Sequence, residues 1–307
     1  MSDLSRPRIA DAVTFSVIIP TCDRNEDLAR CLEAIGANDQ DIRSQSTSRG
    51  TLRMGKPNLQ YEVIVTDDGA KLSAESLVLE RFPWARWIKG LRRGVAANRN
   101  FGASHAIGDW LAFVDDDCIP AAGWLEAYAS AVATFPECGV FEGRTSPKGL
   151  QTRADQECPV NLKGGQLWGC NFAIRRQLFF DLQGFDERFP MAGVEDIDFQ
   201  VRLEKRGCKI HFLPDALVQH PWRKKKDIRF YLRVTKSIGY FVSKHADSKI
   251  GFSEIWAIKR AIRAIVFEFP RNLIRFRDGS SFRVLYLELV WAISVFFELL
   301  TNRLRLI

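Results

Sequence analysis

Residues 14–24 read Thr-Phe-Ser-Val-Ile-Ile-Pro-Thr-Cys-Asp-Arg, an apolar run that ends in a polar cluster. This run predicts a buried β-strand over 14–19 that stops at Pro20. Two other segments have the same form, because Tyr61-Glu-Val-Ile-Val-Thr66 precedes Asp67-Asp68-Gly69 and Trp110-Leu-Ala-Phe-Val114 precedes Asp115-Asp116-Asp117. The sequence therefore predicts three strands, each followed by acidic residues.

Segments with the apolar spacing of helices alternate with these strands. Helices are predicted over 25–35, 74–81, 96–106 and 121–134, and short strands over 86–88 and 139–141. Such alternation with short connections predicts an α/β fold, with a mostly parallel, Rossmann-like sheet covered by helices on both faces. Ligands of such sheets bind beyond the carboxyl ends of the strands, where the polar clusters fall. Residues 37–58 are polar and predict a surface insertion.

Composition and charge exclude several classes of protein. The 307 residues are 46% apolar, which excludes wholesale disorder. Seven scattered cysteines without a C-x-x-C pair indicate a reducing compartment, and the first twelve residues lack the apolar core of a secretion signal. Residues 1–222 hold 26 Lys+Arg and 30 Asp+Glu, whereas residues 223–307 hold 18 and 7. An acidic body argues against a nucleic-acid binder, since phosphate contacts need basic groups near the site.

The basic region 223–307 predicts three helices, over 227–245, 253–269 and 282–304, with breaks near 248–251 and at Pro270 and Gly279. Its apolar run of 17 residues, 284–300, is shorter than the ~20 residues that cross a bilayer. The polar residues of this run share one side, which predicts an amphipathic helix. Basic residues among aromatic and aliphatic ones favour an anionic membrane surface. Packing on the catalytic body and an oligomer interface are the alternatives.

The three adjacent carboxylates of Asp115, Asp116 and Asp117 repel one another unless a cation or solvent compensates them. A solvated turn with helix caps is one interpretation. Their place after a buried strand, with Asp67 and Asp68 after another, favours a site for Mg²⁺ or Mn²⁺, which prefer carboxylate and phosphate oxygens.

These segments form an ordered series of motifs over about 14–222 that resembles the family 2 glycosyltransferases. The resemblance implies the GT-A fold, a nucleotide-sugar donor, a divalent metal (Mn²⁺ or Mg²⁺) and inversion at the anomeric carbon. The motifs are Ser16-Val-Ile-Ile-Pro-Thr-Cys-Asp-Arg24, Val63-Ile-Val-Thr-Asp-Asp-Gly69, Gly94-Val-Ala-Ala-Asn-Arg-Asn-Phe-Gly102, Phe113-Val-Asp-Asp-Asp117, Trp168-Gly-Cys-Asn-Phe-Ala-Ile-Arg175, Gly184-Phe-Asp-Glu-Arg-Phe189, Gly193-Val-Glu-Asp-Ile-Asp-Phe199 and His220.

The resemblance also implies a role for individual residues. Arg99 is expected to face the nucleotide or to pair with Asp23 or Asp68. Asp117 is implied as the direct metal ligand and His220 as a further one. The residues expected to bind the nucleotide-sugar are Thr21, Asp23, Arg24, Asp67, Asp68, Arg99, Asp115 and Asp116.

On the acceptor side the resemblance implies Trp168 and Asn171, with an aromatic face over a sugar ring. Asp196 is implied as the general base that deprotonates the acceptor hydroxyl, and Glu195 as the residue that positions donor or acceptor. The two roles can be exchanged. Structural interpretations are a core position for Trp168, a structural or solvated His220, and a helix N-terminus that favours the two carboxylates.

The predicted organisation is a GT-A catalytic domain over 14–222 and a basic helical extension over 223–307. The predicted protein transfers a sugar to a glycan or lipid-linked acceptor in polysaccharide or glycoconjugate synthesis, from the cytoplasmic face of a membrane. No Gln-x-x-Arg-Trp segment, the mark of processive synthases, occurs in the sequence. The alternatives are an inactive membrane-associated sugar-binding or scaffold protein and a sugar-phosphate nucleotidyltransferase. The latter would have a Gly-rich loop where Pro20–Arg24 stands.

Overall fold

A computed structural model describes residues 13–37, 53–54, 59–245 and 252–305 of the chain. By its internal contacts the chain divides into two units, of which the first comprises 1–146, 161–184 and 207–219, and the second 147–160, 185–206 and 220–307. The predicted division into 14–222 and 223–307 stays a prediction. The predicted break near 248–251 and most of the predicted insertion over 37–58 lie outside the described residues.

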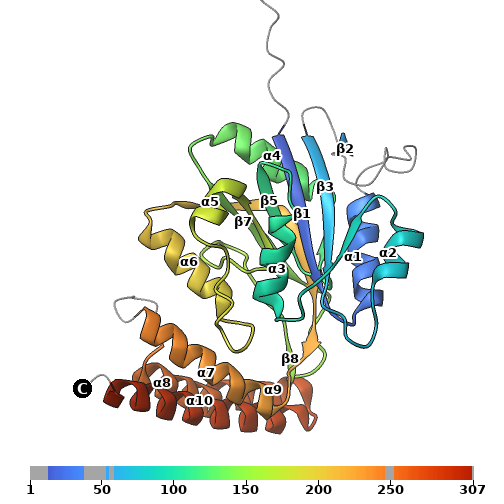
Figure 1. Ribbon diagram of the computed structural model, residues 1–307. Coiled ribbons are helices and arrows are strands. Elements are labelled where there is room, and N and C mark those ends of the chain that lie inside the picture. Colours follow the sequence, from blue (N-terminus) through green and yellow to red (C-terminus); the bar gives the residue numbers. More distant parts are fainter. Residues whose placement is uncertain (1–12, 38–52, 55–58, 246–251, 306–307) are drawn as a thin grey trace, which may run out of the picture. The chain divides into compact units, whose positions relative to one another are not determined.

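The first unit is built on a nine-stranded sheet of order β2-β3-β1-β5-β9-β7-β10-β6, with β4 also paired to β3 (Figure 1). Its elements are β1 (Val13–Thr21), α1 (Asn25–Ala37), β2 (Arg53–Met54), β3 (Leu59–Asp67), α2 (Glu75–Arg81), β4 (Arg86–Lys89), α3 (Val95–Ser104), β5 (Trp110–Val114), β6 (Ile119–Pro120), α4 (Trp124–Thr134), β7 (Val140–Lys148), β9 (Asn171–Arg175), α5 (Arg176–Asp181) and β10 (Ile210–Pro221).

Strands β4, β3, β1 and β5 are parallel neighbours, whereas β9 runs antiparallel to β5 and β7. The predicted end of the first strand at Pro20 is wrong, since Pro20 pairs with Thr66 and the strand continues to Thr21. A proline fits there because the pairing with β5 stops at Ile18, so no ladder bond needs its missing N–H on that side.

Alternate residues of β1 send their side chains to opposite faces of the sheet. Phe15, Val17 and Ile19 join one apolar core with Leu28 and Leu32 of α1. On the other face Gly102 of α3 lies so close that a Cβ there would come 2.6 Å from Cγ2 of Ile18. Helices therefore cover both faces of the sheet, as predicted.

The second unit is mainly helical, and α7, α8, α9 and α10 gather in one part of Figure 1. One apolar core joins Val201 of α6, Phe241 of α7, Ala257 of α8 and Val295 of α10. Its elements are β8 (Gln156–Glu157), α6 (Glu195–Lys205), β11 (Arg223–Lys224), α7 (Ile228–Lys244), α8 (Glu254–Arg263), the π-helical turn η2 (Ala264–Glu268), α9 (Phe269–Phe276) and α10 (Ser280–Arg305).

The predicted helix break at Pro270 is wrong, because the helical backbone continues through this residue. It stands in the first turn of α9, directly after the π-helical turn, where the wider i→i+5 pattern accommodates a residue without an N–H.

Candidate active site

Three parallel strands of the first unit end at the same edge of the sheet and carry the predicted acidic residues there. Thr21 closes β1 opposite Asp67, the last residue of β3, and Asp115 follows β5 directly. Parallel strands place such side chains together at their carboxyl ends, because all of the strands run in the same direction. The acidic residues predicted to bind the nucleotide therefore lie at the ends of adjacent strands of this sheet.

Asp116 and Asp117 share one cation from the chain itself. Nη1 of Arg24 donates to Oδ1 of Asp116 at 3.2 Å and to Oδ2 of Asp117 at 3.1 Å, and the Thr21 hydroxyl donates to Asp116 at 2.8 Å. Burial raises the pKa of Asp116 to about 7, although the charge of Arg24 opposes that shift. The guanidinium thus lies where a cation is needed to compensate two carboxylates.

Arg99 projects from α3 and pairs with Asp115, with Nη2 2.6 Å from Oδ1. Asp115 is thus a partner of Arg99 that the sequence did not indicate. The guanidinium packs closely on Gly169, where a Cβ would come 2.7 Å from its Cζ. Arg99 is almost fully buried, so the pair fixes Asp115 at the strand end.

Asp23 accepts hydrogen bonds from backbone N–H groups of the loop that follows β3. Asp23, itself at φ 55°, accepts the N–H groups of Ala70, Lys71 and Leu72 through Oδ1. Hydrogen bonds from Leu72 and Lys71 lower the pKa of Asp23. Its observed contacts therefore shape the loop after β3.

Asp67 and Asp68 do the same for two further turns. Asp67 accepts hydrogen bonds from the backbone of Gly69 and Ala74 and from the indole of Trp87. Asp68 accepts the N–H of Arg92, and burial raises its pKa. Both carboxylates therefore fix backbone turns at the carboxyl edge of the sheet.

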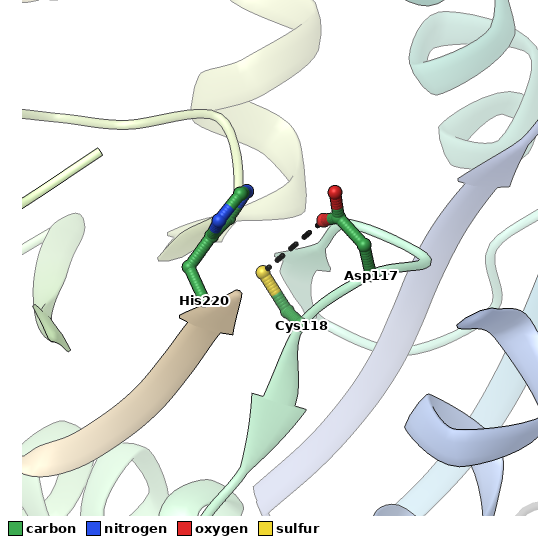
Figure 2. A group of neighbouring side chains, drawn as sticks. All are labelled: Asp117, Cys118 and His220. Atoms are coloured by element: carbon green, nitrogen blue, oxygen red, sulfur yellow. Dashed lines mark hydrogen bonds between the residues drawn. The ribbon is translucent and has the colours of Figure 1, made fainter. Parts of the chain in front are cut away.

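A possible metal-ligand group lies beside this edge. Asp117, Cys118 and His220 each offer a ligand atom, and these atoms lie within 4.8 Å of one another (Figure 2). The boundary between the two units passes through β10, just before His220. The antiparallel pairing of Gln219 with Ile119 continues in register to place His220 opposite Cys118. Strand β10 therefore brings the predicted histidine to Asp117.

The donor set fits a divalent metal of the Mn²⁺ kind through two of its three members. Nδ1 of His220 lies 2.8 Å from the carbonyl oxygen of Pro221, which can only accept, so Nδ1 carries the proton and Nε2 the lone pair. Burial raises the pKa of the Cys118 thiol well above its ordinary value, which opposes formation of the thiolate that binds metals. The fit therefore rests on Asp117 and His220. The sequence analysis did not single out Cys118. This residue joins the group because the register of β6 and β10 places it opposite His220.

Asn171 has a structural role. Its Oδ1 accepts from Nε1 of Trp124 and from the hydroxyl of Tyr128, and its Nδ2 donates to the carbonyls of Arg144 and Ala216. These four bonds use the full capacity of an amide side chain, so none remains for a sugar acceptor. We therefore do not propose Asn171 as a residue that binds the acceptor.

Trp168 is half-buried and packs against the core of the first unit. The loop before it is held by Glu142, whose carboxylate accepts from the amide of Asn161 and from the N–H groups of Gly165 and Gln166. Sequence reasoning missed Glu142, which stands in a strand whose length the apolar pattern did not show.

The second unit carries the Glu195–Asp196 pair in the first turn of α6. Both side chains are buried. Oε2 of Glu195 accepts the N–H groups of Gly193 and Val194, and Oδ1 of Asp196 accepts that of Ile197. Carboxylates are favoured at a helix N-terminus by its dipole. One carboxylate oxygen of each residue is therefore fixed by hydrogen bonds from backbone N–H groups.

Asp198, which also belongs to the first turn of α6, is buried in an ion-pair cluster. It lies 2.8 Å from Arg202, 2.6 Å from Lys244 and 2.7 Å from His245. Lys244 and His245 stand at the end of α7, so the cluster ties α6 to α7 within this unit.

The sequence model of the family described as "Glycosyl transferase family 2" matches residues 16–191, more than half of the chain. The chain belongs to this family. The predicted membership is thereby confirmed.

The matches between this family 2 chain and its curated relatives cover only part of each relative. The "Probable N-acetylgalactosaminyltransferase 9" of Caenorhabditis elegans is 26% identical over 216 residues, which cover 58% of this chain and 37% of the relative. "Glycosyltransferase AglE" of Haloferax volcanii is 24% identical over 227 residues, which cover 68% of this chain and 67% of that protein. The chain thus spans little more than a third of the first relative.

Solved structures share the fold of this family 2 chain. The mannosyltransferase PcManGT from Pyrobaculum calidifontis, in complex with GDP-Man and Mn²⁺, superposes with a TM-score of 0.57 at 16% identity, covering 93% of this chain and 86% of that one. TarS 1-349 of S. aureus in complex with UDP-GlcNAc gives 0.56 at 16% identity, covering 94% and 90%. The predicted α/β, GT-A fold class is confirmed.

Proposed function

We propose that this protein is an inverting, metal-dependent glycosyltransferase that moves one sugar, or very few, from a nucleotide-sugar donor to a hydroxyl group of a glycan or lipid-linked acceptor in polysaccharide or glycoconjugate synthesis. The observation that carries the proposal is the set of Asp115, Asp116 and Asp117 at a strand end, held by Arg99, Arg24 and Thr21. Family membership and the likeness to a UDP-GlcNAc complex and a GDP-Man complex support it.

The donor site of the proposal is the sheet edge of the first unit. Thr21, Asp23, Asp67 and Asp68 line the nucleotide pocket, where their hydrogen bonds fix the surrounding loops. Arg99 sets the position of the Asp115 carboxylate for a ribose contact or for support of the metal.

Asp117 and His220 are the proposed metal ligands. A carboxylate and an imidazole together favour Mn²⁺ over Mg²⁺, because imidazole suits transition metals better than it suits magnesium. When bound, the metal would supply positive charge against the diphosphate of the leaving nucleotide. Arg24, which holds the Asp117 carboxylate in this structure, would have to release it to the metal.

For the acceptor, Asp196 is the proposed general base. It takes the proton of the acceptor hydroxyl as the oxygen attacks the anomeric carbon from the face opposite the nucleotide. The bond from that carbon to the diphosphate breaks in the same step, so one displacement inverts the configuration. Glu195, whose carboxylate is held by two backbone N–H groups, is suited to positioning. Trp168 remains the proposed aromatic surface for the acceptor.

We also propose that the protein acts at the cytoplasmic face of a membrane. Residues 280–304 of α10 form a 25-residue segment whose most apolar 18-residue window has a mean hydropathy of 1.8, so the helix is long and apolar enough to cross a bilayer by length and composition. Glu288 on this helix is buried and paired with Lys225 and Arg260 of the same unit. Those pairs favour a helix packed in the unit over a span, because spanning would place the carboxylate in hydrocarbon.

The testing experiment measures donor binding by calorimetry and nucleotide release from UDP-, GDP- and dTDP-sugars, with Mn²⁺, Mg²⁺ or EDTA. We expect one donor to bind and turn over with Mn²⁺, and Asp117→Ala to abolish both. Glu80→Ala, which removes an exposed carboxylate of α2, is the matched control and retains both. Absence of binding by every donor under every metal condition would refute the proposal.

A further inference from the structure

The helical stretch α8–η2–α9 exposes a row of large apolar side chains. At ~100° per residue, Ile255, Ile258 and Ile262 fall within about 60° of one another on α8. Phe267 of η2 is 67% exposed and Ile274 of α9 is 72% exposed. We call these residues and the cations between them the α8–α9 surface. Its apolar part is too continuous for an ordinary solvated helix face.

Cations border this apolar row. Lys259 and Arg263 lie about 40° and 80° round the helix from Ile255, so they flank the row on one side. Among the described residues, Lys259 and Arg271 make no ion pair, whereas Arg263 pairs with Glu268 at 2.9 Å. Basic groups beside an apolar stripe are typical of helices that lie in a membrane interface.

A groove of about 420 Å³ opens on the same surface. Its lining combines three cations and one acid with two apolar side chains: Lys259, Arg263, Arg271, Glu268, Ile262 and Phe267. The π-helical turn lies at the centre of this lining and places Phe267 beside the basic residues. The groove is therefore lined by both basic and apolar side chains.

The balance of charge decides what covers this surface. Acidic groups of the second unit are paired internally, for example Glu288 with Arg260 and Glu298 with Lys236. Positive charge therefore remains outside, in a region that carries 18 Lys+Arg and 7 Asp+Glu. A second copy of this surface would be repelled, whereas anionic lipid head groups would be attracted.

We propose that the α8–α9 surface docks on an anionic bilayer, with Ile262 and Phe267 inserted at the interface and the phosphate of one lipid head group in the groove between Lys259 and Arg271. This inference rests on the proposed action at a membrane and names the part of the chain that makes the contact. The outer face of α10 exposes Phe282, Tyr286 and Phe297, but the cations beside it, Arg283 and Arg303, are paired with Asp155 and Glu254, so we do not assign it as the docking face.

The test is flotation of the full chain with vesicles of phosphatidylcholine, with and without phosphatidylglycerol. We expect binding only with phosphatidylglycerol, weakened by salt. The double variant Lys259→Gln/Arg271→Gln lowers the affinity about 30-fold, from about 1 kcal/mol per basic residue. Arg229→Gln/Arg233→Gln, an equal charge change on exposed positions of α7, lowers it less than about threefold.

A second pair of variants tests the apolar contact. Phe267→Ala lowers vesicle affinity about tenfold, and Phe297→Ala on α10 less than about threefold. Equal losses in both double charge variants, a larger loss in Phe297→Ala, or no binding to anionic vesicles would each overturn the inference. Calorimetric donor binding by the same preparations tests the proposed enzyme separately, so failure of docking in a chain that binds donor refutes the inference alone.

Discussion

Replacing Asn171 by alanine removes the centre of a buried hydrogen-bond network in the first unit. The variant leaves the indole N–H of Trp124, the hydroxyl of Tyr128 and the carbonyls of Arg144 and Ala216 without their present partner. A buried polar group that loses its partner costs about 1–3 kcal/mol. With part of the loss relieved by solvent in the vacated volume, we expect the free energy of unfolding to fall by about 4 kcal/mol.

Urea unfolding followed by circular dichroism measures this loss. With a slope of about 3 kcal/mol per molar urea, the midpoint falls by about 1.3 M. Asn272→Ala, a partly exposed position of α9, is the control and changes the free energy by less than about 0.5 kcal/mol.

A double-mutant cycle with Tyr128→Phe tests the cause. In the wild type this change removes one donor to Asn171 and costs about 1 kcal/mol, whereas in the Asn171→Ala background the hydroxyl has already lost its acceptor and the cost nearly vanishes. Additive losses would refute the network. A stable Asn171→Ala variant that bound donor but failed only in transfer would restore the acceptor contact implied by the resemblance.

Three other perturbations have expected outcomes. Burial raises the pKa of Asp186, but hydrogen bonds from basic neighbours outweigh it and hold the pKa below its ordinary 3.8; the resulting stability is present above about pH 4 and is lost as the pH falls. Asp186→Asn should therefore lower the urea midpoint at pH 7, with a difference that shrinks in acid, and a constant difference would contradict this. Gly102→Ala brings a Cβ to 2.6 Å from Ile18 and should cost about 1–3 kcal/mol, checked by the same unfolding measurement. Arg24→Gln removes the cation that competes for Asp117, so calorimetry without donor should show tighter Mn²⁺ binding; weaker binding would mean that Arg24 supports the metal site.

Strands β1, β3 and β5 and their acidic ends could be predicted from the sequence because each is a local pattern. An apolar run followed by Asp is visible along the chain, and β5 was predicted with the observed bounds. Strand β9 was not among the elements predicted from the sequence. The full length of strand β10 could not be predicted, because its polar residues beyond Leu213 gain pairing partners only in the folded sheet.

The partners of the candidate site residues were harder to predict than the residues themselves. Sequence spacing cannot show that Arg24 bridges two carboxylates, because positions 24 and 117 come together only through the strand order. The pairing of Arg99 with Asp115 likewise depends on how α3 lies on the sheet. The proposed catalytic and binding roles stay predictions, for which the experiments above provide the tests.

The ion-pair cluster around Asp198 has a consequence for how the chain can be cut or recombined. Helix α6 carries Glu195 and Asp196 at its start, and its Asp198 depends on Lys244 and on His245, which lies 47 residues further along the chain at the end of α7. A version shortened before α7 would keep every residue of the proposed chemistry, yet it would leave the buried Asp198 carboxylate with Arg202 and without its partners Lys244 and His245. The C-terminal helices are therefore not an exchangeable module: a graft onto another enzyme of this family would need matching partners on its own α6.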